Sequence, residues 1–156
     1  MASGKEHDRA IKLWILPFGL LAAVIYNLQI AFIFSFAFAV GGLWLSPDLD
    51  IISKPLKRWG FLQVLWWPYR KIIPHRSNLS HSPIIGTTIR LIYLVGILII
   101  INLLLSKFIN LEPLILLRNV NKIITLYPEK IIALVVGIEV SAWVHIIQDK
   151  YHQIKD

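Results

Sequence analysis

The sequence predicts an all-α protein: an integral membrane bundle of about four transmembrane helices, with an interfacial loop between the second and the third. Of the 156 residues, 56% are hydrophobic, and the mean hydropathy is +0.66. A soluble domain of this size has too few polar residues to cover that much apolar surface. The apolar residues form runs long enough to cross a bilayer, so we expect residues 1–156 to form a single membrane-embedded domain.

Composition also restricts the chemistry. The chain has no cysteine, which excludes disulfides, thiolate zinc sites and thiol nucleophiles. A transition metal would have to be held by His, Asp, Glu or backbone groups. The formal net charge of +7 could indicate nucleic-acid binding, but in so apolar a chain basic residues favour lipid headgroups. Membrane lipid is therefore the expected partner, and nucleic acid is not.

The first two helices are expected at residues 11–26 and 29–45. One helix over 11–45 would be about 52 Å long at ~1.5 Å per residue, too long for a hydrocarbon core of about 30 Å. We place the break near Asn27. The polar leader before residue 11 mixes acids and bases, and the apolar run is much longer than a signal core of about 7 to 15 residues. No cleaved signal is expected.

Ser46-Pro47 is predicted to end the second helix, because proline lacks an amide hydrogen and disfavours helix at the preceding residue. Asp48 and Asp50 follow at once. If this segment is extended, side chains two residues apart point the same way, so both carboxylates can face one site. They either bridge metal ions or only cap and terminate structure.

Residues 51–82 form the longest polar connection, in which cations alternate with aromatic residues. This pattern is typical of a segment at headgroup level, where rings lie at the interface and charges meet phosphates. An RNA-stacking patch is the alternative. The cations are Lys54, Lys57, Arg58, Arg70, Lys71 and Arg76, and the aromatic residues are Trp59, Trp66, Trp67 and Tyr69.

Two further crossings are expected at 84–105 and 130–149. Ser82-Pro83 predicts the start of the third helix, with serine as N-cap and proline at the first helical position. Arg90 would either extend to the headgroups, which we favour, or point inward to an anionic substrate. Residues 106–129 have room for one surface helix. In the fourth crossing His145 and Asp149 are four residues apart and share a helix face.

An even number of crossings returns the chain to its starting side, so four helix ends share one face. Every histidine and the acids next to the helix ends are expected there. An unpaired carboxylate at such a position is costly unless it meets a cation. Of the 16 Lys and Arg residues, only Lys107, Arg118, Lys122 and Lys130 fall on the opposite side. The positive-inside rule therefore places the histidine side in the cytoplasm.

Several motifs at these helix ends resemble a known family. They are Ser3 to Asp8, Ser46 to Asp50, Arg58-Trp59-Gly60, Trp67 to Arg70, His75 to Pro83 with Gly86, and His145 to Asp149. The chain resembles small uncharacterised bacterial membrane proteins, mainly cyanobacterial, described as metal-binding. It is similar, more remotely, to YdjM-type inner-membrane metal-dependent hydrolases and to the zinc-dependent phospholipase C superfamily. The resemblance implies a multi-pass protein of a bacterial inner (plasma) or thylakoid-type membrane.

The same resemblance implies a helical bundle in which His and Asp from several helices bind one to three divalent ions. The ligand set carried over by motif is His7, Asp48, Asp50, His75, His81, His145 and Asp149. His7 is a candidate on the motif alone. His75 with His81 could instead make loop hydrogen bonds, and Asp149 could either share a metal with His145 or orient that imidazole. Ala142-Trp143-Val144 stands where YdjM-type proteins have a serine next to the histidine, so support of His145 is expected to differ.

The predicted function follows from these ligands. Imidazole and carboxylate without thiolate suit zinc, with manganese or iron as alternatives. Such a metal could activate water for phosphoester hydrolysis, plausibly of a lipid, while Arg70 and Arg76 hold phosphate. The alternative is a non-catalytic membrane protein that binds lipid or a protein partner. In that case the metal site is structural and links the helix ends. The sequence leaves the oligomeric state open.

Overall fold

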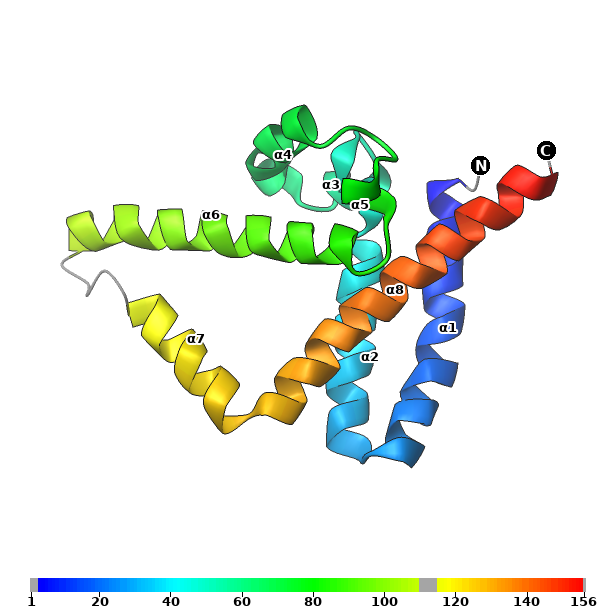
Figure 1. Cartoon of the computed structure of the whole chain (residues 1–156), viewed down its shortest axis with the longest axis horizontal. Helices are drawn as coiled ribbons and strands as arrows, with labels where there is room; N and C mark the ends of the chain where they lie inside the picture. Colours follow the sequence, from blue (N-terminus) through cyan, green and yellow to red (C-terminus); the bar gives the residue numbers. More distant parts are fainter. Residues whose placement is uncertain (1–2, 110–114, 156) are drawn as a thin grey trace.

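The computed structural model describes residues 3–109 and 115–155, and within them every regular element is helical. The all-α prediction is confirmed. In Figure 1, α1 and α2 form an antiparallel hairpin, α8 crosses it diagonally, and the short helices lie together at one end. The long helices are α1 (Gly4–Ile25), α2 (Leu28–Leu43), α6 (Ile85–Ile109), α7 (Ile115–Leu126) and α8 (Pro128–Lys155). The short ones are η1 (Pro47–Asp50), α3 (Lys54–Lys57), η2 (Gly60–Trp66), α4 (Trp67–Ile72) and α5 (Asn78–His81).

Local capping sets the ends of the α1–α2 hairpin. Ser3 and Glu6 form a reciprocal capping box at the start of α1, and the Ser3 amide holds the pKa of the Glu6 carboxyl below its usual value. Asn27 caps α2, where its Oδ1 accepts a hydrogen bond of 2.9 Å from the Ile30 amide. The chain therefore turns at Tyr26 and Asn27, where the sequence predicted the break.

α8 packs closely against α2. A Cβ placed on Gly137 would lie 2.5 Å from the Phe34 carbonyl oxygen, so only glycine allows the two helices to approach this far. Ile30, Phe34 and Phe38 of α2 form a buried cluster with Ile11 of α1 and Ala133 of α8. This core fixes the relative positions of the three helices whose ends carry the candidate ligands.

The connection between α2 and α6 folds back on itself instead of lying flat. Leu49, Leu56, Trp66 and Tyr69 form its buried core, and Tyr93 of α6 donates a hydrogen bond to the Leu65 carbonyl oxygen. Trp66 is only 1% exposed, whereas Trp67 is 56% exposed. The expectation that all four aromatic residues lie at headgroup level is therefore wrong for Trp66 and Tyr69, because η2 and α4 turn them inward.

Two contacts pin this folded segment to the hairpin. The Arg58 guanidinium binds the Asp8 carboxylate of α1 at 2.5 Å and also donates to the Leu43 carbonyl oxygen at 2.7 Å. The Trp59 indole donates to the Trp44 carbonyl oxygen at 2.9 Å. These bonds hold the short helices over the end of α1 and α2.

The start of α6 differs from its prediction. Ser82 and Pro83 precede the helix without capping it, and Ile84 adopts a strained positive φ of 63°. The Ile84 amide instead donates to the Glu139 carboxylate of α8 at 2.7 Å. A side chain from a distant helix therefore replaces the predicted serine cap.

Within the part of the chain that the structure describes, three helical stretches are long and apolar enough to cross a membrane: Leu28–Asp50, Ile85–Phe108 and Pro128–Ile154. The expected α1 crossing falls short because charges from Lys5 to Lys12 occupy its first turns. α6 extends sideways from the other long helices in Figure 1, and only 6% of its apolar window is buried. The predicted bundle of about four crossings is therefore realised only in part: α1, α2 and α8 pack together, and α6 does not lie along them.

Candidate metal centre

The seven predicted ligands come from five parts of the fold and meet at one end of it. In the order His7, Asp149, His145, Asp48, His81, Asp50 and His75, a nitrogen or oxygen of each residue lies within 3.6 Å of an oxygen or nitrogen of the next. They are His7 of α1, Asp48 and Asp50 of η1, His75 after α4, His81 of α5, and His145 and Asp149 of α8.

The η1 turn decides what its two carboxylates contact. Ser46 accepts from the Asp48 amide and Pro47 occupies the first position, so the segment forms a 3₁₀ turn and not the extended segment considered from the sequence. Asp48 therefore faces His81 and His145, whereas Asp50 faces His75. The two carboxylates belong to adjacent groups.

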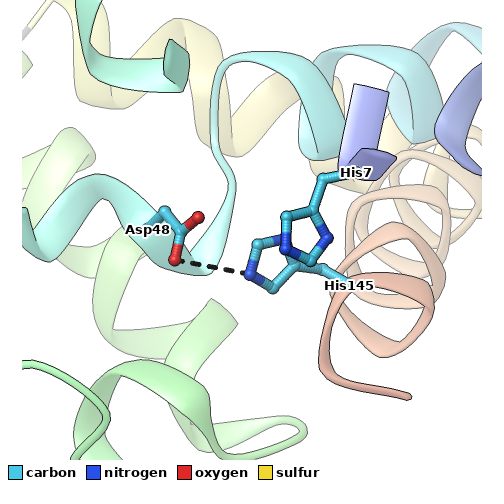
Figure 2. Close-up of side chains that lie close together, drawn as sticks. All are labelled: His7, Asp48 and His145. Carbon is cyan, nitrogen blue, oxygen red and sulfur yellow. Dashed lines mark ion pairs between the residues drawn. The ribbon is translucent and has the colours of Figure 1, made fainter. Parts of the chain in front are cut away.

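Three histidines and two carboxylates form what we call the central group: His7, Asp48, His81, His145 and Asp149. Nε2 of His145 lies 3.4 Å from Oδ1 of Asp48 and 3.6 Å from Oδ2 of Asp149. Nε2 of His81 lies 3.5 Å from the same Asp48 oxygen, and Nε2 of His7 lies 3.3 Å from Oδ1 of Asp149. Figure 2 shows the His7 ring face to face with that of His145, and Asp48 directed at the latter.

A neutral oxygen faces the opposite nitrogen of every imidazole in the central group. Nδ1 of His7 lies 3.0 Å from Oε1 of Gln148, that of His145 lies 3.3 Å from Oγ of Ser46, and that of His81 lies 2.9 Å from Oγ of Ser80. An acceptor at Nδ1 keeps the proton there and leaves the Nε2 lone pair free, as in most metal-binding histidines.

Two of these Nε2 atoms show that the residues fit a cation. Those of His81 and His145 are buried and have no hydrogen-bond partner among the described residues. A buried polar atom without a partner costs free energy. A divalent ion would coordinate both atoms and neutralise the two carboxylates. A site made of histidine and aspartate without cysteine suits zinc, manganese or iron.

Asp50 and His75 form a second, more open pair. Nδ1 of His75 lies 3.0 Å from Oδ1 of Asp50, whose other oxygen accepts from the Arg76 amide at 3.3 Å. Nδ1 of His81 is also 3.6 Å from that oxygen, so Asp50, His75 and His81 could hold an ion together. They could do so only if His81 exchanged its Ser80 contact for the metal.

The two predicted phosphate-binding arginines lie in different clefts. Arg76 adopts a positive φ of 59°, and its guanidinium lies 3.8 Å from the Asp149 carboxylate. Arg70 lines a separate cleft with Trp67 and Lys71. Only Arg76 is therefore next to the central group.

A cleft of about 500 Å³ borders the central group. His7, Asp48 and Asp149 line it, together with His75, Ile51 and Ile52. Its cationic side chains are Lys5, Lys54, Lys57 and Arg76. Carboxylates and imidazoles that share a cleft with four cationic side chains favour an anionic ligand that meets a bound cation.

The sequence analysis did not identify the three oxygens that face Nδ1. Ser80 and Gln148 each precede a candidate ligand directly, and Ser46 comes two residues before Asp48. A polar residue next to a candidate ligand was the available signal. Although Ala142-Trp143-Val144 offers no serine next to His145, Ser46 at the start of η1 supplies one in the structure. His152 lies outside the central group, where it contacts Glu6 and the Gln148 carbonyl oxygen.

Comparisons with known proteins agree with a metal centre. An uncharacterized protein of Aquifex aeolicus (strain VF5) is 44% identical over 62 residues, which are 39% of this chain and 43% of that protein. The chain thus spans less than half the length of this curated relative. No solved structure matches the chain. A family described as uncharacterized metal-binding protein (DUF2227) matches residues 2–155. The chain therefore belongs to this metal-binding family.

Proposed function

We propose that this protein is a membrane-embedded, divalent-metal-dependent phosphoester hydrolase whose site faces the cytoplasm. The observation that carries the proposal is the grouping of three imidazole Nε2 atoms and two carboxylates beside a cationic cleft that His7, Asp48 and Asp149 line. A structural metal site is closed, whereas a catalytic one leaves a position for substrate. The open cleft beside the central group favours the catalytic alternative.

In this proposal, different residues bind the metal, orient its ligands and bind phosphate. His7, His81, His145, Asp48 and Asp149 would hold the ion, while Gln148, Ser46 and Ser80 orient the three rings. The ion, when bound, would supply Lewis-acid activation of water and of a phosphoryl oxygen. Arg76, Lys54 and Lys57 line the same cleft and would bind phosphate oxygens, the arginine in bidentate fashion.

A lipid phosphoester is the substrate class that we favour. Ile52 is 70% exposed on the cleft wall, beside lysines that suit a charged headgroup. Exposed large apolar side chains cover the outer faces of the long helices, among them Phe32, Phe36 and Ile92. Exposed apolar area on this scale is expected of a surface that contacts membrane or another protein, and we favour membrane. The excess of cations in the connections on the metal side supports a cytoplasmic orientation.

The test uses the full chain purified in detergent, its metal content measured by mass spectrometry, and its turnover of a phosphodiester such as bis-p-nitrophenyl phosphate. We expect the wild type to carry a divalent ion and to turn over the diester, and we expect Asp48→Ala and His145→Ala to lose both. His152→Ala is the matched control and should retain both. Bound metal without turnover of this diester or of phospholipid would overturn the hydrolase and favour the structural metal site. Equal metal in all variants would overturn the central group itself.

A further inference from the structure

Arg90 lies buried inside the fold, although α6 itself is largely exposed. Its side chain is 2% exposed, so the favoured prediction that it extends to headgroups is wrong. Nη1 donates to the Ser80 carbonyl oxygen at 2.9 Å and Nη2 donates to Oγ1 of Thr87 at 3.0 Å. Burying a guanidinium is costly. Its direct hydrogen bonds both go to neutral oxygens, and the one from Nη1 holds the backbone at Ser80.

That backbone belongs to the turn that presents His81. Ser80 is fully buried, and it joins Arg90 to the central group through two different atoms. Its carbonyl oxygen accepts from Arg90, while its hydroxyl lies 2.9 Å from Nδ1 of His81. The hydroxyl also has the Ser77 and Pro74 carbonyl oxygens within 3.3 Å and 3.4 Å. Because it donates to one of these carbonyls, it is left to accept the His81 Nδ1 proton.

The consequence at His81 is a defined orientation. With its proton on Nδ1, the imidazole directs the Nε2 lone pair toward Asp48, whose Oδ1 is 3.5 Å away. This is the buried Nε2 without a hydrogen-bond partner among the described residues. A shift of Ser80 would leave Nδ1 without its acceptor and would free the ring to turn toward Asp50, 3.6 Å from Nδ1.

Gly86 makes room for this arrangement. A Cβ at Gly86 would lie 2.5 Å from the Ser80 carbonyl oxygen and 3.5 Å from Nη1 of Arg90. Any larger residue would separate the guanidinium from the carbonyl. Gly96, on the same helix, has nothing within 4 Å of the equivalent position. The two glycines therefore offer a matched pair of substitutions.

We propose that Arg90 is a positioning residue of the metal centre, which acts through Ser80 to set the tautomer and direction of His81. The proposal rests on metal binding by the central group and is independent of the reaction catalysed. α6 thus determines one ligand of a centre to which it contributes no ligand itself. Replacing a residue that hydrogen-bonds a metal ligand typically weakens metal binding by about 10- to 100-fold.

The experiment titrates Co²⁺ into the detergent-solubilised, metal-free full chain and follows the visible absorption bands, which report coordination geometry. Thermal unfolding of the same metal-free samples measures stability separately. We expect Ser80→Ala, which keeps the carbonyl oxygen and removes only the hydroxyl, to weaken Co²⁺ binding about 10- to 100-fold and to shift the bands. Arg90→Met and Gly86→Ala should do the same, and Gly96→Ala should match the wild type.

The outcomes separate the possibilities. Wild-type affinity and spectrum in Ser80→Ala would overturn the proposal, whatever Arg90→Met does, since the hydroxyl is the link that it requires. If Arg90→Met fails to fold, Ser80→Ala and Gly86→Ala decide. Lower stability of Gly86→Ala with unchanged Co²⁺ binding would show that Arg90 and Ser80 only support packing, which also overturns it. Absence of Co²⁺ binding in the wild type would instead reject the proposed function.

Discussion

The imidazole ring of His7 stacks on that of His145, with centroids 3.8 Å apart and planes inclined by 20°. Both side chains are buried, and they come from opposite ends of the chain. Imidazole binds metal in its neutral form. Both Nε2 atoms lie within 3.6 Å of an Asp149 oxygen, so the stack presents two ligands to one position.

His75→Ala should retain most of the bound metal. His75 pairs with Asp50 at the cleft surface and does not contact the central group's carboxylates Asp48 and Asp149. We expect its metal content to stay within a few-fold of the wild type, while that of His145→Ala falls to background. Metal content by mass spectrometry, on samples of equal purity, makes the comparison. An equal loss in both variants would show that His75 belongs to the metal site together with His145.

Gln148→Leu should weaken metal binding about 10- to 100-fold, because it removes the acceptor 3.0 Å from Nδ1 of His7. Gln148→Glu keeps an acceptor oxygen there and should bind metal as well as the wild type. A competition titration against a chromophoric chelator measures both affinities. If leucine and glutamate give the same affinity, His7 does not depend on Gln148.

Removal of metal should lower thermal stability. The central group joins α1, η1, α5 and α8, so an ion bound there stabilises the folded state only. An ion present at 100 times its dissociation constant contributes about 2.7 kcal/mol, or about 5 to 10 °C in Tm for a chain of this size. Differential scanning fluorimetry with and without EDTA measures the shift. Asp48→Ala is the control, in which the chelator should change nothing.

The two ends of the α1–α2 hairpin should lie on opposite sides of a membrane. The chain has no cysteine, so one introduced thiol gives an unambiguous label. Tyr26→Cys, at the exposed turn after α1, should react with a membrane-impermeant maleimide in intact cells. Gln63→Cys, on exposed η2 near the metal end, should react only after lysis. Labelling of the Gln63→Cys variant in intact cells would reverse the proposed orientation, and labelling of both would reject a membrane-spanning hairpin.

Local signals explain what the sequence could establish. Hydropathy and caps act within a few residues, and they determined the helical class and the turn at Asn27. The helix ends were less well defined, because α1 begins at Gly4 within the predicted polar leader and α8 continues to Lys155. They also made histidines and aspartates next to helix ends conspicuous, since such groups are costly without a partner. All seven candidate ligands lie in one connected group in the structure.

Tertiary structure decided the rest, because contacts between distant residues leave no local pattern. Glu139 replaces the predicted serine cap of α6. The packing around η2 and α4 buries Trp66 and Tyr69, and α6 does not run alongside α1, α2 and α8. The same applies to the centre: the η1 turn separates Asp48 from Asp50, and three uncharged side chains orient the imidazoles. Arg90 points inward because it donates to the Ser80 carbonyl oxygen, which belongs to a turn outside α6. The residues of α6 alone therefore could not predict this orientation. The sequence identified the candidate ligands, and packing alone decided which nitrogen of each imidazole faces the carboxylates of the central group.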